Sequence, residues 1–163
     1  MTSDSHYYTI EKPSVAEFKE RGSKFIAYAF PIADVSEFKL RLAEIKKEHP
    51  KATHHCFAYR LGLDGNTYRV SDDGEPSGSA GKPILGQIDS KQVTNVLVIV
   101  VRYFGGTQLG IPGDGGEATR IQMNKVANKA VYQGQTPPQN IFNPAAWADF
   151  IQAWKRGDFK NKN

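Results

Sequence analysis

Apolar residues alternate with polar ones, or run together, in several short segments of this chain. This pattern predicts β-strands, at residues 6–11, 23–32, 53–61, 67–70 and 93–103. Residues 23–32 and the run Val96–Val101 are apolar on both faces. Strands of that kind are typical of the centre of a covered sheet, so we expect these two segments to lie inside the sheet.

Two other segments carry helical signals. Asp34 begins a capping-box pattern with Glu37, and apolar side chains then recur at helical spacing as far as Ile45. Pro50 ends this helix, because the residue before a proline is disfavoured in the α region. Residues 83–88 predict a helical turn or short helix that follows a polar loop.

The last third of the chain has a different pattern. Residues 118–125 and 126–133 are interpreted as two short polar strands. Asn143 and Pro144 are typical of a helix N-cap and first position, which predicts a helix near residues 144–156. Its apolar face is expected to be buried, against the sheet or within the tail, with a partner-binding helix as the alternative. We therefore predict two parts, residues 1–113 and residues 114–163.

Composition narrows the class of protein. The chain has 163 residues, of which 39% are hydrophobic and 23% are charged, as in an ordinary globular domain. A single cysteine, Cys56, excludes an internal disulfide and fits a reducing cytosol. No apolar run is long enough for a membrane span, and residues 1–6 show no secretory signal. We expect a cytoplasmic protein, and the net charge of +4 gives only weak support for a nucleic-acid partner.

The polar stretch Ser71–Pro83 is the most informative part of the sequence. It is rich in glycine and proline, so it is expected to run as a surface loop between strands. Its carboxylates Asp72, Asp73 and Glu75 have the oxygen ligands that Mg²⁺ prefers. No nucleotide signature accompanies them, and the same carboxylates could also cap the turn that follows Pro83 or pair with Lys82 and Arg102, so all three interpretations stay open.

Residues 54–56 are His-His-Cys within a predicted strand. Adjacent strand residues point to opposite faces, so His54 and His55 cannot share one metal ion through this geometry. No zinc-ligand spacing is present either, and we expect no structural metal. Cys56 has His54 as a same-face neighbour and a possible base. An inert, buried thiol is nevertheless favoured, because an apolar strand raises a thiol pKa.

The segment that follows the strand at 93–103 combines several binding groups. Arg102 offers a guanidinium, Tyr103 an aromatic face, and Gly105 and Gly106 offer backbone N–H groups. This combination suits a phosphate backbone or an RNA base.

Four blocks of sequence together resemble the IMPACT/YigZ family. The blocks are residues 54–60, 71–76, 80–83 and 100–110, and the resemblance covers about residues 8–113. It implies a domain like the second domain of ribosomal protein S5, a sheet with helices packed on one face. It also implies a role linked to translation, through RNA, the ribosome or a translation regulator, without an established catalytic activity. The motif residues include Gly74, Pro76, Gly81 and Gly110.

The chain departs from this family pattern at Asp114, where family members continue into an apolar helix. From there the tail resembles a small actinobacterial domain of unknown function. Either the chain is a fusion, or the tail takes the place of the family's helix and covers the sheet.

We therefore predict an α+β, non-enzymatic binding protein associated with translation. No catalytic residue, cofactor or metal is expected, and the partner is RNA or the ribosome, or a translation-regulatory protein, with no membrane. The predicted binding residues are His54, His55, Asp72, Asp73, Glu75, Lys82, Arg102, Tyr103, Gly105 and Gly106. One alternative is a metal-assisted hydrolase that uses His54 or His55 with Asp72, Asp73 and Glu75. A second alternative is a pure protein-interaction module.

Overall fold

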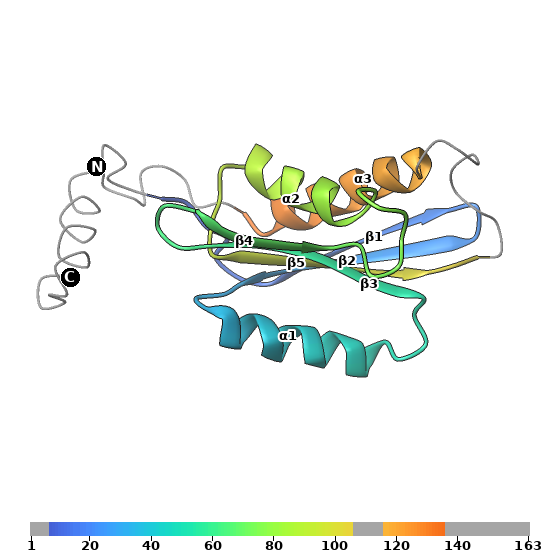
Figure 1. The fold of residues 1–163 in the computed structure, drawn as a ribbon, viewed down its shortest axis with the longest axis horizontal. Helices are drawn as coiled ribbons and strands as arrows, with labels where there is room; N and C mark the ends of the chain where they lie inside the picture. The colour runs from blue at the N-terminus through green and yellow to red at the C-terminus, as the bar shows by residue number, and fades with distance from the viewer. Residues whose placement is uncertain (1–6, 106–115, 136–163) are drawn as a thin grey trace, which may run out of the picture.

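A computed structural model describes residues 7–105 and 116–135 (Figure 1). The elements follow one another along the chain as β1 (Ser14–Glu20), β2 (Ser23–Pro31), α1 (Val35–Glu48), β3 (His54–Leu61), β4 (Thr67–Ser71), α2 (Gly81–Ser90), β5 (Val96–Tyr103) and α3 (Glu117–Gln133). The predicted helix near 144–156 lies outside the described residues, as do Gly106 and Gly110.

The strands form one sheet in the order β1-β2-β5-β3-β4, and every neighbouring pair is antiparallel. The apolar strand β5 lies in the middle, between β2 and β3, as its two apolar faces predict. In the register between β3 and β5, His54 lies opposite Arg102. The β3–β5 pairing therefore brings two of the predicted binding residues side by side.

Helices cover both faces of the sheet (Figure 1). On one face α2 and α3 pack on alternate strand residues such as Phe25, Ala27 and Val98 in one buried cluster. On the other face α1 inserts Phe38 and Ile45 into a second cluster. The α+β class is confirmed, but the prediction of helices on one face is wrong. The strand residues that point to the second face are also apolar, so a helix must cover that face as well, and α1 does so. The finer likeness to ribosomal protein S5 stays a prediction.

The sequence signals of α1 are confirmed in atomic detail. Asp34 is the N-cap, and its Oδ1 accepts a hydrogen bond of 2.9 Å from the Glu37 backbone N–H. The Glu37 carboxylate in turn accepts from the backbone N–H of Ala33 at 2.5 Å. The helix ends at Glu48, just before His49 and Pro50.

The first strand of the chain differs from the prediction. Residues 6–11 were expected to form a strand, but in the described part of this segment only Tyr8 forms an isolated bridge, to Val93. The sheet edge beside β2 is formed instead by β1, where Ala16 is buried while Val15 is exposed. An edge strand with one wet face carries a weak apolar signal, which is why the sequence pattern did not predict it.

The two polar strands predicted at 118–125 and 126–133 are wrong, because these residues form the single helix α3. Its buried residues Met123, Val126, Ala127, Ala130 and Val131 recur at helical spacing and belong to the same core cluster as the sheet. This part of the predicted tail therefore covers one face of the sheet. That position agrees with the alternative in which the tail takes the place of the family's helix.

Within the described residues, no helix has the length and apolar character needed to cross a membrane. The expected cytoplasmic location stays a prediction.

Two glycines of α2 provide a test of this packing. A Cβ at Gly81 would lie 2.8 Å from the Ser71 backbone nitrogen and 2.9 Å from the Val70 Cβ, whereas one at Gly86 would meet nothing within 4 Å. Gly81→Ala should lower the free energy of unfolding in a urea titration by about 1–3 kcal/mol, through overpacking. Gly86→Ala, the matched control, should be neutral or stabilising by up to about 1 kcal/mol. Equal effects of the two substitutions would contradict the close approach of α2 to β4.

Candidate functional site

The acidic loop between β4 and α2 is held in shape by the side chain of Asp72. Its carboxylate accepts three backbone N–H groups: that of Gly78 at 3.0 Å, that of Ala80 at 3.2 Å and that of Gly81 at 2.8 Å. The last of these is the first residue of α2. A carboxylate there satisfies N–H groups that a helix start leaves unpaired, and it complements the helix dipole. Asp72 is therefore a structural residue of the loop.

Asp73 joins the loop to β3. It lies at a turn with φ of +44°, and its carboxylate accepts the His55 backbone N–H at 2.6 Å. Its carbonyl oxygen lies 2.6 Å from His54 Nδ1. A carbonyl can only accept, so His54 Nδ1 carries a proton and Nε2 is the nitrogen that faces the rest of the site.

The centre of the site is a buried ion pair between Glu75 in the loop and Arg102 on β5. Arg102 Nη1 lies 2.7 Å and 2.9 Å from the two carboxylate oxygens, and the two side chains are 5% and 2% exposed. The guanidinium lies over the rings of Phe25 at 5.2 Å and Phe104 at 5.6 Å. His54 Nε2 lies 3.8 Å from the Glu75 carboxylate. The ion pair and its aromatic neighbours thus tie the loop to the middle of the sheet.

A cavity of about 220 Å³ opens beside this ion pair. It is bordered by the loop, by the end of β5 and by the first turn of α3, and its lining residues are His54, Gly74, Glu75, Pro76, Arg102, Phe104 and Thr119. We call this space the Arg102 cavity. Its walls come from three of the four sequence blocks and from α3, so the sequence reasoning located most of it but missed Phe104 and Thr119.

Two predicted binding residues lie on the opposite face of the sheet. The Tyr103 hydroxyl is 2.5 Å from His49 Nδ1, beside α1, and His49 Nε2 is 2.6 Å from the Tyr28 hydroxyl. His55 Nε2 donates to the His49 carbonyl oxygen at 2.9 Å. Tyr103 and His55 follow Arg102 and His54 in their strands, so alternation sends them away from the Arg102 cavity. They form a separate hydrogen-bonded group under the C-terminal end of α1.

The remaining predicted residues occupy mixed positions. Lys82 is exposed on the first turn of α2 and has no ion pair among the described residues. The Gly105 backbone N–H, which we expected to meet a ligand, donates to Ser23 Oγ at 3.2 Å instead. A Cβ at Gly105 would lie 2.1 Å from the Gly22 carbonyl carbon. Glycine is therefore required there by the close approach of the β1–β2 turn.

The predicted metal ligands have other partners. The Asp72, Asp73 and Glu75 carboxylates accept from backbone N–H groups and from Arg102, as described above. Among residues 7–105 and 116–135, no group of three or more His, Cys, Asp or Glu side chains is arranged to hold a metal ion. The hydrolase alternative needs these oxygens as ligands, so the geometry weighs against it.

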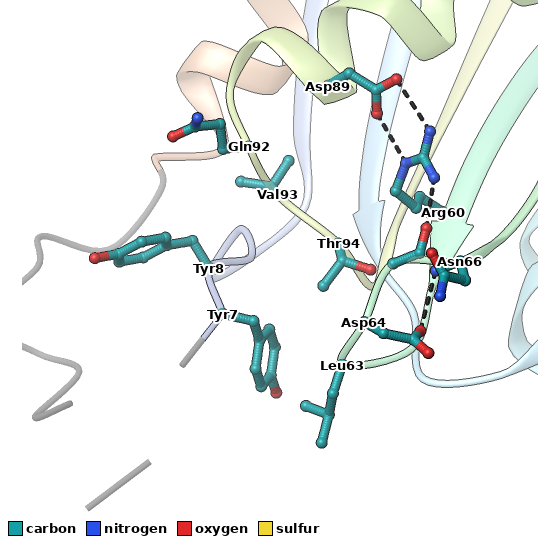
Figure 2. Close-up of a pocket in the computed structure, with 11 residues that line it drawn as sticks. Tyr7, Tyr8, Arg60, Leu63, Asp64, Asn66, Asp89, Gln92, Val93 and Thr94 are labelled. Carbon is teal, nitrogen blue, oxygen red and sulfur yellow. Dashed lines mark hydrogen bonds and ion pairs between the residues drawn. The ribbon is translucent and has the colours of Figure 1, made fainter. Parts of the chain in front are cut away.

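A second hollow lies at the other end of the sheet, between the N-terminal segment and the β3–β4 turn (Figure 2). Its volume is about 460 Å³. Figure 2 shows Tyr7 and Tyr8 on one side and Arg60 on the other, where Arg60 forms a paired hydrogen bond to Asp89 at 2.8 Å and 3.0 Å. Nothing in the sequence pattern pointed to this hollow, because its described walls come from three separate stretches of the chain with no shared motif.

The fold and the Arg102 cavity together define an α+β domain with a small polar cavity at the loop between β4 and α2. The chain belongs to the family described as the Impact N-terminal domain, whose model matches residues 21–130. This match extends beyond the predicted boundary at 113 and includes most of α3.

Individual relatives agree with this assignment. The chain is 36% identical over 107 residues to the IMPACT family member YvyE of Bacillus subtilis, a match that covers 66% of this chain and 49% of the relative. It is 40% identical over 101 residues to YigZ of Escherichia coli, covering 61% and 48%. A crystal structure of a hypothetical protein superposes with a TM-score of 0.73 at 31% identity, covering 80% of this chain and 61% of that one. The chain spans about half the length of the curated relatives it matches.

The buried ion pair can be tested by removing its acid. Glu75→Ala leaves Arg102 buried without its counter-charge, and loss of one partner of such a pair costs about 3–5 kcal/mol of unfolding free energy. The control is Glu44→Ala, which removes an exposed ion pair to Arg41 of 3.4 Å on α1. That change should cost less than about 1 kcal/mol. Similar midpoints for the two variants in urea unfolding would contradict the structural role of Glu75.

The thiol of Cys56 is a second test. It is buried in β3 and donates to the Asp72 carbonyl oxygen at 3.2 Å. Burial, and then the carboxylates of Glu75, Asp73 and Asp72, raise the pKa of this thiol well above its ordinary value. Because only the thiolate is nucleophilic, the folded protein should resist iodoacetamide at pH 8.5 and react fully once unfolded in urea. Fast labelling of the folded protein would restore the nucleophile hypothesis.

Proposed function

We propose that this chain is a non-enzymatic domain that binds RNA in a translation-associated role. In this proposal α2 and α3 form the surface for the phosphate backbone, and the Arg102 cavity lies at its edge. The link to translation rests on the family resemblance. The RNA contact rests on the charge of the helical surface and on the chemistry of the cavity.

The observation that carries the proposal is the charge of the α2–α3 surface. Four exposed cations and the half-buried Lys91 lie on these helices or at the end of α2, against the two carboxylates of Asp89 and Glu117; the exposed cations are Lys82, Arg120, Lys125 and Lys129. The α1 surface is close to balanced, with four basic and three acidic residues. The α2–α3 surface thus has the larger surplus of positive charge, and such a surplus is typical of a surface that meets phosphate groups.

The surface and the cavity are neighbours in space. Gly116 precedes α3, and a Cβ on it would lie 2.9 Å from the Pro76 ring in the acidic loop. Both helices therefore begin beside this loop, and their side-chain amides at Gln87 and Asn124 are hydrogen-bonded at 3.0 Å. An RNA strand lying along α2 and α3 would have the Arg102 cavity at its end.

The proposal is tested by charge reversal on the helical surface. Lys82→Glu with Lys129→Glu should weaken binding of a labelled single-stranded RNA at least about tenfold at 0.1 M salt, in fluorescence anisotropy. Loss of two phosphate contacts should also make the slope of log K against log[salt] shallower by about 1.4.

The control is Lys39→Glu with Lys46→Glu on α1, which changes the net charge equally on the other face. Equal losses from both pairs would show a general charge effect and contradict a defined surface. Absence of RNA binding by the unaltered chain, together with a partner that survives nuclease treatment in a pull-down, would favour the protein-interaction alternative.

A further inference from the structure

The Arg102 guanidinium uses only part of its hydrogen-bonding capacity. Nη1 donates to both oxygens of Glu75, but the buried Nε has no partner, and no hydrogen bond of Nη2 to a described residue is present. Nε and Nη2 form one edge of the planar group, and two acceptors placed side by side can bind such an edge. A buried donor without a partner is costly, so this edge calls for a ligand.

The charge of the Arg102 cavity restricts the ligand. Glu75 neutralises Arg102 at 2.7 Å, and the pair lies in a site with almost no solvent exposure. An anionic group would meet the Glu75 carboxylate as well as the guanidinium, so a neutral group with two adjacent acceptors fits better. The volume of about 220 Å³ is below the roughly 300–1,000 Å³ of drug-sized sites, which suits one ring system.

The cavity also has an aromatic wall. Phe104 is 45% exposed at the end of β5, and its ring centre lies 5.6 Å from the Arg102 guanidinium carbon. A base can stack on such a ring, and proteins that read single-stranded RNA combine stacking with hydrogen bonds to base edges. Nε itself is buried, so a side chain beside it must move as the base enters.

We propose that the Arg102 cavity binds a guanine base of single-stranded RNA, with Nε and Nη2 donating to guanine O6 and N7. Guanine is the base that presents two neighbouring acceptors, whereas adenine has a donor amino group beside N7. This inference rests on the proposed RNA-binding function and adds the base that the domain selects.

The test uses the unaltered protein and changes the RNA. Labelled oligouridylates with one central guanosine, adenosine, inosine or 7-deazaguanosine are compared by fluorescence anisotropy. Guanosine and inosine should bind about five- to a hundredfold more tightly than adenosine, because both keep O6 and N7. The 7-deaza base lacks the N7 acceptor and should lose most of this advantage.

A protein variant gives a second readout. Arg102→Lys keeps a cation for Glu75 but removes the paired donors, so it should bind all four RNAs with similar affinity. If this variant does not fold, as judged by urea unfolding, the comparison of guanosine with 7-deazaguanosine alone decides the matter.

The outcomes separate the two proposals. Tight RNA binding without base preference, or equal binding of guanosine and 7-deazaguanosine, would overturn guanine recognition and leave the proposed RNA binding intact. Binding of inosine no tighter than adenosine would also overturn it, because recognition would then depend on the guanine amino group. No binding of any of the RNAs would overturn both proposals.

Discussion

The buried ion pair between Arg102 and Glu75 is the interaction on which this site depends. It joins a polar loop to the central strand of the sheet, at a point where both side chains are almost fully buried. Two charges are removed from water at considerable cost, and their attraction offsets this cost only with good geometry. Such a pair contributes little net stability against an apolar replacement. Its effect is to fix where the loop lies, since the described residues place only the Arg102 guanidinium and, at 3.8 Å, the His54 ring beside the Glu75 carboxylate.

The other loop carboxylates support that arrangement by hydrogen bonds to the backbone. The Asp72 carboxylate accepts hydrogen bonds from backbone N–H groups at the start of α2, and the Asp73 carboxylate accepts one from the backbone of β3. Asp72, Asp73 and Glu75 are close in sequence, yet each carboxylate binds a different part of the structure. The three carboxylates of the acidic loop therefore stabilise the conformation of this loop. The loop carboxylates leave the buried Nε of Arg102 without a hydrogen-bond partner. This free donor is the group in the Arg102 cavity that a ligand could bind.

The sequence predicted much of the architecture, because strong periodic segments are decided locally. The central strands and α1 followed from apolar runs and from the Asp34 capping pattern. The edge strand β1 and the helix α3 were not predicted. Their burial depends on contacts with a sheet whose strands are distant in sequence, and a short sequence window does not contain this information. The predicted boundary at residue 113 likewise separates α3 from the sheet on which it packs.

The site was predicted as a set of residues but not as a geometry. Residues of three separated blocks line the Arg102 cavity, where His54, Glu75 and Arg102 lie together. Tyr103 was grouped with Arg102 because it is adjacent in sequence, but strand alternation places it beside His49 on the other face. Phe104 and Thr119 became visible as cavity walls only in three dimensions.

A double-mutant cycle on Glu75 and Arg102 measures the central interaction most directly. Unfolding free energies are compared for Glu75→Gln, Arg102→Met, the double variant and the unaltered chain. The two groups are in direct contact, so we predict a coupling energy of about 2–3 kcal/mol, near the upper end for residues in one network. Additive effects, with a coupling below about 0.5 kcal/mol, would contradict a loop that is held by this pair.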